Sequence, residues 1–301
     1  MNIPLVYHAS YSQLALPATH RFPTSKYQLL QQYLLNHNLT TPADFHSPDK
    51  IDIELIKQVH QPQYVNDFIS NKLEYKVMRR IGFPWSEALL NRTLHAVNGT
   101  TLCAELAIKH GVSLHLSGGY HHAHYDYGSG FCIFNDLMIA ANNMINMGKA
   151  TKVLIIDCDV HQGDGTATLS SHLENIISCS FHCAKNFPSR KPHSDHDIEF
   201  DKGTNDDDFI KTLQQVVPYL IQIYQPDLIL YDAGVDIHSD DDLGYLNIST
   251  GGILSRDKFI FSQAKQAEIP IAAVIGGGYS RNEDELTQRH SQLFIAANSI
   301  W

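Results

Sequence analysis

The chain has no long hydrophobic run and no dense stretch of basic residues. A membrane-spanning helix needs roughly 18 consecutive apolar residues, and the 301-residue sequence contains no such run. Its 22 Lys and Arg against 32 Asp and Glu give a formal net charge of −10, which disfavours binding to nucleic-acid phosphates. The sequence therefore predicts a protein that binds neither membranes nor nucleic acid.

Closely spaced cysteine pairs are also missing. The cysteines are odd in number, and several lie inside apolar runs; they are Cys103, Cys132, Cys158, Cys179 and Cys183. We expect buried free thiols rather than disulfides or a zinc knuckle. The first residues also lack the basic start and apolar core of a secretory signal. These features together favour a cytoplasmic location.

The apolar residues fall in short runs that alternate with amphipathic segments. The length and the 43% hydrophobic content suit a single α/β domain over residues 1–301. The alternation predicts a mainly parallel sheet with helices on both faces. Strands are expected over 4–7, 112–116, 153–157, 176–181, 228–231 and 271–275, and helices over 27–35, 86–109, 135–147, 207–224, 255–268 and 283–298.

Four of the expected strands are followed by glycine-containing turns rich in His, Asp or Tyr. Ligand sites of parallel sheets lie beyond the carboxyl ends of the strands. We therefore expect these turns to form one site. Their sequences are SGGYHHAH (117–124), DCDVHQGDG (157–165), DAGVDIH (232–238) and GGGYS (276–280).

Three side chains in these turns have the chemistry of a metal site. Asp159 and His161 are alternate residues of an extended segment and so share a face, and Asp236 follows another strand. Two carboxylates and one imidazole, with a position left for water, suit a catalytic Zn²⁺ site, with Fe²⁺ as the alternative ion. For any one of these aspartates alone, capping of backbone N–H groups is the simpler interpretation. The set favours the metal site.

Two adjacent histidines, His121 and His122, follow a pair of glycines, and Asp157 and Asp164 are available to hold their rings. A carboxylate on one ring nitrogen fixes the tautomer and raises the basicity of the other nitrogen. Beside a metal, one imidazole can take a proton from water and one can protonate a leaving amine. The pattern predicts hydrolysis.

Tyr279 follows three glycines, which allow close backbone approach. At such a turn its hydroxyl can stabilise a carbonyl oxygen that the metal also polarises. A phosphate-cradling loop is the alternative interpretation of the glycines. No Gly-Lys-Ser/Thr follows them and the chain has no GxGxxG, so nucleotide binding is disfavoured.

Six segments, in this order and spacing, resemble the histone deacetylase superfamily over residues 4–295. They are GGYHHA (118–123), GFCIFND (130–136), DCDVHQGDGT (157–166), GVD (234–236), DLG (242–244) and GGGY (276–279). The early HRFP (20–23) with Lys26 and Tyr27 is similar to the bacterial, class IV-like branch. Gln162 departs from the second histidine of many members, as it does in that branch.

The resemblance implies a three-layer αβα arginase/deacetylase-like fold with a mainly parallel sheet of about eight strands. It implies a zinc-dependent deacetylase that hydrolyses an N-acyl amide, above all acyl-lysine, by metal-activated water. The metal would be held by the three residues named above. His122 would act as general base and later acid, with His121 mainly electrostatic. Asp157 would steady His121, Asp164 would steady His122, and Tyr279 would polarise the carbonyl.

The resemblance also implies a substrate tunnel lined by Gly130, Phe131 and Phe187, and a structural K⁺ beside Asp157. The backbone carbonyls of Asp159 and His161 would contribute to that K⁺ site, together with Ser180.

The sequence allows two kinds of molecule as the carrier of the acyl group. It is an acyl-lysine peptide or protein, or a small acylated amine of the acetylpolyamine type. A weakly active binding protein on the same scaffold is the third reading, but Tyr279, which weakly active branches replace with His, favours a working enzyme. The acidic segment 238–242 either borders the pocket, where it would attract an ammonium group, or is an exposed loop. Residues 193–197 are interpreted as a solvated loop rather than a second metal site.

Overall fold

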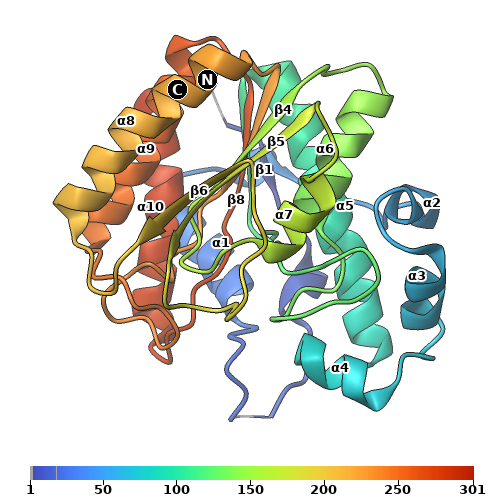
Figure 1. Cartoon of the computed structure of the whole chain (residues 1–301). Coiled ribbons are helices and arrows are strands. Elements are labelled where there is room, and N and C mark those ends of the chain that lie inside the picture. Colours follow the sequence, from blue (N-terminus) through green and yellow to red (C-terminus); the bar gives the residue numbers. More distant parts are fainter. Residues whose placement is uncertain (1–2, 18) are drawn as a thin grey trace.

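A computed structural model describes residues 3–17 and 19–301, and its centre is an eight-stranded sheet in which every pairing is parallel (Figure 1). The strand order is β2-β1-β3-β8-β7-β4-β5-β6. The strands are β1 (Leu5–Val6), β2 (Phe45–His46), β3 (Val112–His115), β4 (Val153–Asp157), β5 (Ile176–Cys183), β6 (His196–Phe200), β7 (Leu228–Asp232) and β8 (Ile271–Val274). The predicted α/β fold class is confirmed.

Helices cover both faces of the sheet, with α8, α9 and α10 on one side and α5 and α6 on the other (Figure 1). The helices are α1 (Lys26–Asn36), α2 (Ile53–Lys57), α3 (Pro62–Ile69), α4 (Tyr75–Ile81), α5 (Glu87–His110), α6 (Asp136–Asn146), α7 (Asp164–Ser170), α8 (Asp206–Tyr224), α9 (Thr250–Gln266) and α10 (Glu283–Ile300), with short 3₁₀ turns η1 (Ala9–Ser12) and η2 (Pro42–Asp44). In the described part of the chain, none of them is long and apolar enough to cross a membrane.

The sheet separates two hydrophobic cores. Successive residues of β4 face opposite sides, as the period of a strand requires. Val153 packs in the core that contains Leu137 of α6, and Leu154 packs in the core that contains Ile260 of α9. The central strands are buried on both faces, which explains why they are apolar runs rather than alternating patterns.

Two strands and four short helices were not predicted. The two-residue β2 and the polar β6 lie at the edges of the sheet, so neither has an apolar run. The reading of 193–197 as a loop is wrong at its end, because His196 and Asp197 belong to β6 and pair with Cys179 and Ser180. In the described part of the chain all five cysteines are buried and unpaired, as predicted.

His60 is a fully buried histidine that joins two turns near the site. Its Nε2 accepts a hydrogen bond from the backbone N–H of Asn135 at 2.9 Å, and its Nδ1 lies 2.8 Å from the carbonyl oxygen of His124. These partners require a neutral ring with its proton on Nδ1. Burial lowers the pKa of His60 to about 4.

We expect the free energy of unfolding to fall as the pH drops from about 6.5 to about 4. In that window the unfolded chain binds a proton at His60 while the folded chain does not, at a cost on the order of 3 kcal/mol by pH 4. Urea unfolding at pH 7 and pH 4 measures the loss. His60→Gln keeps an acceptor and a donor without titrating, so its loss should be smaller by about that amount; an equal loss in both proteins contradicts the assignment.

Candidate active site

The predicted turns follow β3, β4, β7 and β8, which are neighbours in the sheet. Their carboxyl ends therefore meet at one edge. The histidine pair (His121 and His122) follows β3, and Tyr279 follows β8. The candidate metal triad (Asp159, His161 and Asp236) follows β4 and β7. The structure brings all six of these side chains and their carboxylate partners together.

In the candidate metal triad, one ligand atom from each residue lies within 4.8 Å of the others. His161 Nδ1 is 2.9 Å from Asp159 Oδ1 and 3.1 Å from Asp236 Oδ2. Backbone N–H groups orient the carboxylates: Gly277 donates to Asp159 Oδ2 and Val160 donates to Asp236 Oδ1, each at 2.9 Å. The triad is therefore held in position by the turns themselves.

The donor set fits a divalent cation. All three residues are buried, and two buried carboxylates need a positive charge to balance them. Burial opposes the charged imidazole, but the hydrogen bonds with Asp159 and Asp236 raise the pKa of His161 to about 10. The two carboxylates thus favour a positive charge between them, which a divalent cation would supply.

The two imidazoles of the histidine pair are held in the same way but titrate differently. His121 Nδ1 lies 2.7 Å from Asp157 Oδ2, and His122 Nδ1 lies 2.6 Å from Asp164 Oδ1. The two Nε2 atoms are 3.2 Å apart. Burial opposes a charge on either ring, yet Asp157 raises the pKa of His121 well above its usual value. Burial and the neighbouring His121 lower the pKa of His122 to about 4.

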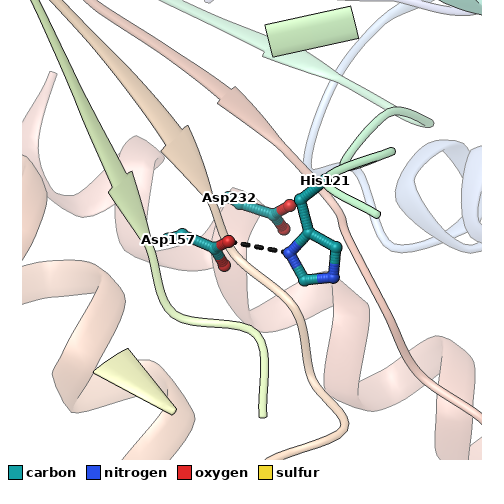
Figure 2. A group of neighbouring side chains, drawn as sticks. All are labelled: His121, Asp157 and Asp232. Atoms are coloured by element: carbon teal, nitrogen blue, oxygen red, sulfur yellow. Dashed lines mark hydrogen bonds and ion pairs between the residues drawn. The ribbon is translucent and has the colours of Figure 1, made fainter. Parts of the chain in front are cut away.

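Asp232 is a neighbour of the pair that sequence reasoning did not single out. It lies across from Asp157 in the register of β7 and β4, and the two carboxylates lie beside His121 (Figure 2). Asp232 is fully buried, and among the described residues neither of its carboxylate oxygens has a hydrogen-bond partner. Burial and Asp157 raise its pKa well above the usual value. These three residues form a second group able to hold a cation.

Two buried cations hold the turns in place, and neither was predicted. Lys26 Nζ donates to the carbonyl oxygen of Gly276 at 3.1 Å, and burial lowers the pKa of Lys26 to about 8. Arg256 Nη1 donates to the carbonyl oxygens of Gly234 at 2.6 Å and Cys158 at 3.3 Å. Arg256 thus joins the turn that carries Asp236 to the turn that carries the other two triad members.

A cavity of about 920 Å³ opens onto these groups, and His122, His161, Asp164 and Tyr279 reach into it. Burial and the nearby carboxylates raise the pKa of Tyr279, so its hydroxyl stays protonated and can donate a hydrogen bond. The backbone N–H of Tyr279 donates to Asp241 at 2.7 Å, which fixes this turn.

The cavity wall includes the three residues expected to line the substrate tunnel. Gly130 has a φ of 52°, and a Cβ there would lie 2.7 Å from His122 Cδ2, so a side chain would displace the imidazole. Phe131 has a φ of 67°, a strained conformation for an aromatic residue. Its ring centroid is 5.9 Å from that of Tyr279, and the half-exposed Phe187 lies edge-on to His122 at 4.9 Å.

The acidic segment 238–242 does not line this cavity in the described part of the chain. It packs against the backbone of Tyr279 instead, through Asp241 and Asp242. The segment thus forms no part of the cavity wall, while Leu243, which follows it, and Tyr279, to which it binds, do line the cavity.

The sequence and the fold both match known proteins. The profile of the histone deacetylase domain matches residues 20–294. The chain is 42% identical over 301 residues to an uncharacterised protein of Picosynechococcus sp., and the alignment covers 100% of both chains. It is 28% identical over 295 residues to histone deacetylase 2 of Arabidopsis thaliana, covering 93% of this chain and 76% of the relative.

Solved structures show the same fold at low sequence identity. An HDAC homologue from Aquifex aeolicus has a TM-score of 0.84 at 19% identity, covering 99% of this chain and 84% of that chain. An HDAC homologue complexed with SAHA has a TM-score of 0.82 at 19% identity, covering 100% and 88%. With the deacetylase domain matched over most of its length, the chain belongs to the histone deacetylase family.

Proposed function

We propose that this chain, as one domain over residues 1–301, hydrolyses an N-acyl amide, and that its substrate is an acylated lysine. The observation that carries the proposal is the histidine pair, whose rings differ in protonation, beside the candidate metal triad at the buried end of one cavity. The family of the chain supports deacetylation as the reaction. The structural neighbour complexed with SAHA supports a cavity that accepts a ligand.

The ion that we propose for the triad is Zn²⁺, with Fe²⁺ as the alternative. When bound, such an ion supplies Lewis-acid chemistry, which polarises a carbonyl group and makes water more acidic. Asp159, His161 and Asp236 would hold it.

We also propose a structural K⁺ beside Asp157. Its ligands would be the Asp157 side chain and the backbone carbonyls of Asp159 and His161. Ser180 is the register partner of Asp157 on β5 and lies on the side away from Asp232. The unpartnered carboxylate of Asp232 supports a cation in this region, because a buried carboxylate with no donor is costly.

The chain's own residues provide the proton path. His122 is neutral because of its lowered pKa, and Asp164 holds its Nδ1 proton, so Nε2 is the ring nitrogen that can accept a proton from the attacking water. That nitrogen also lies 3.2 Å from Nε2 of His121. The same nitrogen then returns that proton to the leaving amine. The charged ring of His121 and the Tyr279 hydroxyl stabilise the negative charge that develops on the carbonyl oxygen.

Hydrolysis of an acetyl-lysine peptide by the purified chain tests this proposal. We expect acetate release that stops when a chelator removes the metal and returns when Zn²⁺ or Fe²⁺ is added back. An acetylated diamine in the same assay tests the small-amine alternative. Full activity after chelation, with no metal left in the protein, would contradict the proposed chemistry.

The five buried, unpaired cysteines support a further part of the proposal, namely that the protein works in a reducing compartment such as the cytoplasm.

A further inference from the structure

The mouth of the active-site cavity is basic, although the chain as a whole has a net charge of −10. Four exposed or half-buried cations line it, and we call them the cationic rim: Arg80, Lys185, Arg190 and Lys191. Among the described residues, Asp164 is the single acidic residue that lines the cavity, and it is buried between two histidines. In the described part of the chain, the lysine and arginine side chains that form ion pairs are Lys57, Lys149, Arg256, Arg281 and Arg289, and none of these belongs to the rim. The four rim side chains therefore give the cavity lining a positive charge.

The rim is built into the fold rather than carried on loose side chains. Lys191 Nζ donates to three backbone carbonyl oxygens, those of Ala184 at 3.2 Å, Asn186 at 2.8 Å and Pro188 at 2.8 Å. The loop 184–191 therefore wraps around this ammonium group, and it presents Lys185 and Arg190 at the cavity. The end of the loop is tied to the site, because Gln162 Nε2 donates to the carbonyl oxygen of Pro192 and lies 2.8 Å from Asp197 Oδ1.

Arg80 belongs to a different part of the chain, near the end of α4, and also lines the cavity. Its guanidinium carbon lies 3.7 Å from the ring centroid of Tyr127, a distance at which a cation–π interaction holds the side chain. Tyr127 in turn stacks on His124, with ring centroids 4.3 Å apart. Two separate parts of the chain thus place positive charge at one opening.

The acidic segment 240–242 lies outside the cavity wall. The three aspartates of 240–242 pack near the turn of Tyr279, and each is engaged within the protein. Asp240 lies 3.7 Å from Arg289, and Asp242 lies 3.6 Å from Arg281. Asp241 accepts a hydrogen bond from the backbone N–H of Tyr279. None of them lines the cavity.

The cationic rim lies where it can contact the part of the substrate that stays outside the cavity. The catalytic groups are at the buried end, so the acyl group enters first and its carrier remains at the mouth. We propose that the cationic rim recognises an acyl-lysine whose neighbouring residues carry carboxylates, so that the substrate is an acidic peptide segment. The inference rests on the proposed function and narrows it.

The same charges act against two other carriers. An acylated polyamine keeps at least one ammonium group near the mouth, and a lysine- and arginine-rich segment brings several, so both meet like charges. The rim thus favours the peptide over the small-amine alternative, and it favours acidic over basic peptides.

The test uses the full, Zn²⁺-loaded chain and three acetyl-lysine peptides of equal length, with flanks of Asp and Glu, of Ser and Gly, or of Lys and Arg. At low ionic strength we expect kcat/KM for the acidic peptide to exceed that for the basic one by about tenfold. The ratio should shrink towards one in about 1 M salt, where charges are screened beyond roughly 3 Å. An acetylated diamine should also react about tenfold more slowly than the acidic peptide.

Charge-reversed variants locate the effect. In Lys185→Glu/Arg190→Glu the rim holds two positive and two negative side chains, so the kcat/KM ratio of the acidic to the basic peptide should fall towards one. The matched control is Lys50→Glu/Lys211→Glu, which makes the same charge change at exposed positions away from the cavity and should keep the wild-type ratio.

Equal kcat/KM values for the three peptides would overturn the inference and leave the proposed function standing. Faster turnover of the diamine than of every peptide would overturn the inference and also the choice of acyl-lysine as substrate, while hydrolysis of an N-acyl amide would stand. If no peptide is hydrolysed, the proposed function fails. Binding of the same peptides, measured by fluorescence anisotropy, then tests whether the cationic rim prefers acidic peptides. Tighter binding of the acidic peptide then supports the inference, and equal binding rejects it.

Discussion

Replacing His122 by alanine should lower kcat/KM for an acetyl-lysine peptide by about 10²- to 10⁴-fold, the usual contribution of a general acid–base group. His122 is the member of the histidine pair that is neutral at physiological pH, and Asp164 holds its Nδ1, which leaves Nε2 as the accepting nitrogen. Steady-state kinetics on the metal-loaded variant measures the effect.

The fold of this variant should survive. The ring is one wall of a cavity, and its loss leaves Asp164 still within 3.1 Å of His124. Thermal unfolding and metal content serve as controls, since both should stay close to wild type. A properly folded, metal-loaded His122→Ala protein with unchanged turnover would reject the proposed role.

Tyr279→Phe removes one oxygen atom and should lower kcat by about 10²- to 10³-fold, as expected for the loss of one donor to a developing oxyanion. The ring contact with Phe131 and the backbone bond to Asp241 do not involve the hydroxyl, so the turn should keep its shape. KM should change little, because the hydroxyl acts mainly in the transition state.

The matched control is Tyr245→Phe, the same chemical change at a half-exposed tyrosine of the cavity mouth. It should keep kcat near the wild-type value. A Tyr279→Phe protein that is as active as this control would show that the phenol does not stabilise the carbonyl oxygen.

Sequence reasoning found the central strands and the turns after them because both have strong local signals. The residues of β4 and β7 are buried on both faces, so each strand is an apolar run that ends in a cluster of polar side chains. The rule that parallel strands end at one edge is enough to predict that Asp236 shares a site with Asp159. Gly130, Phe131 and Phe187 came from the family resemblance alone.

Other parts of the site depend on contacts between residues far apart in sequence. Nothing near Lys26 indicates that its ammonium group reaches the carbonyl of Gly276, 250 residues away. The same holds for Arg256, which bonds to two strand-end turns from within α9. For the acidic segment 238–242 the sequence allows both a pocket border and an exposed loop. Its aspartates are instead bound by arginines and backbone N–H groups that no pattern predicts.

The claim on which the proposed function depends is that Asp159, His161 and Asp236 jointly hold one divalent ion. Metal analysis of the full chain by inductively coupled plasma mass spectrometry, after loading with Zn²⁺ and dialysis, tests it most directly. We expect one ion per chain in the wild type. In Asp236→Asn we expect an affinity lowered by more than about 100-fold, since losing even an outer partner of a ligand costs about 10- to 100-fold. A wild-type chain that retains no ion, or a variant that binds it as tightly, would contradict the claim.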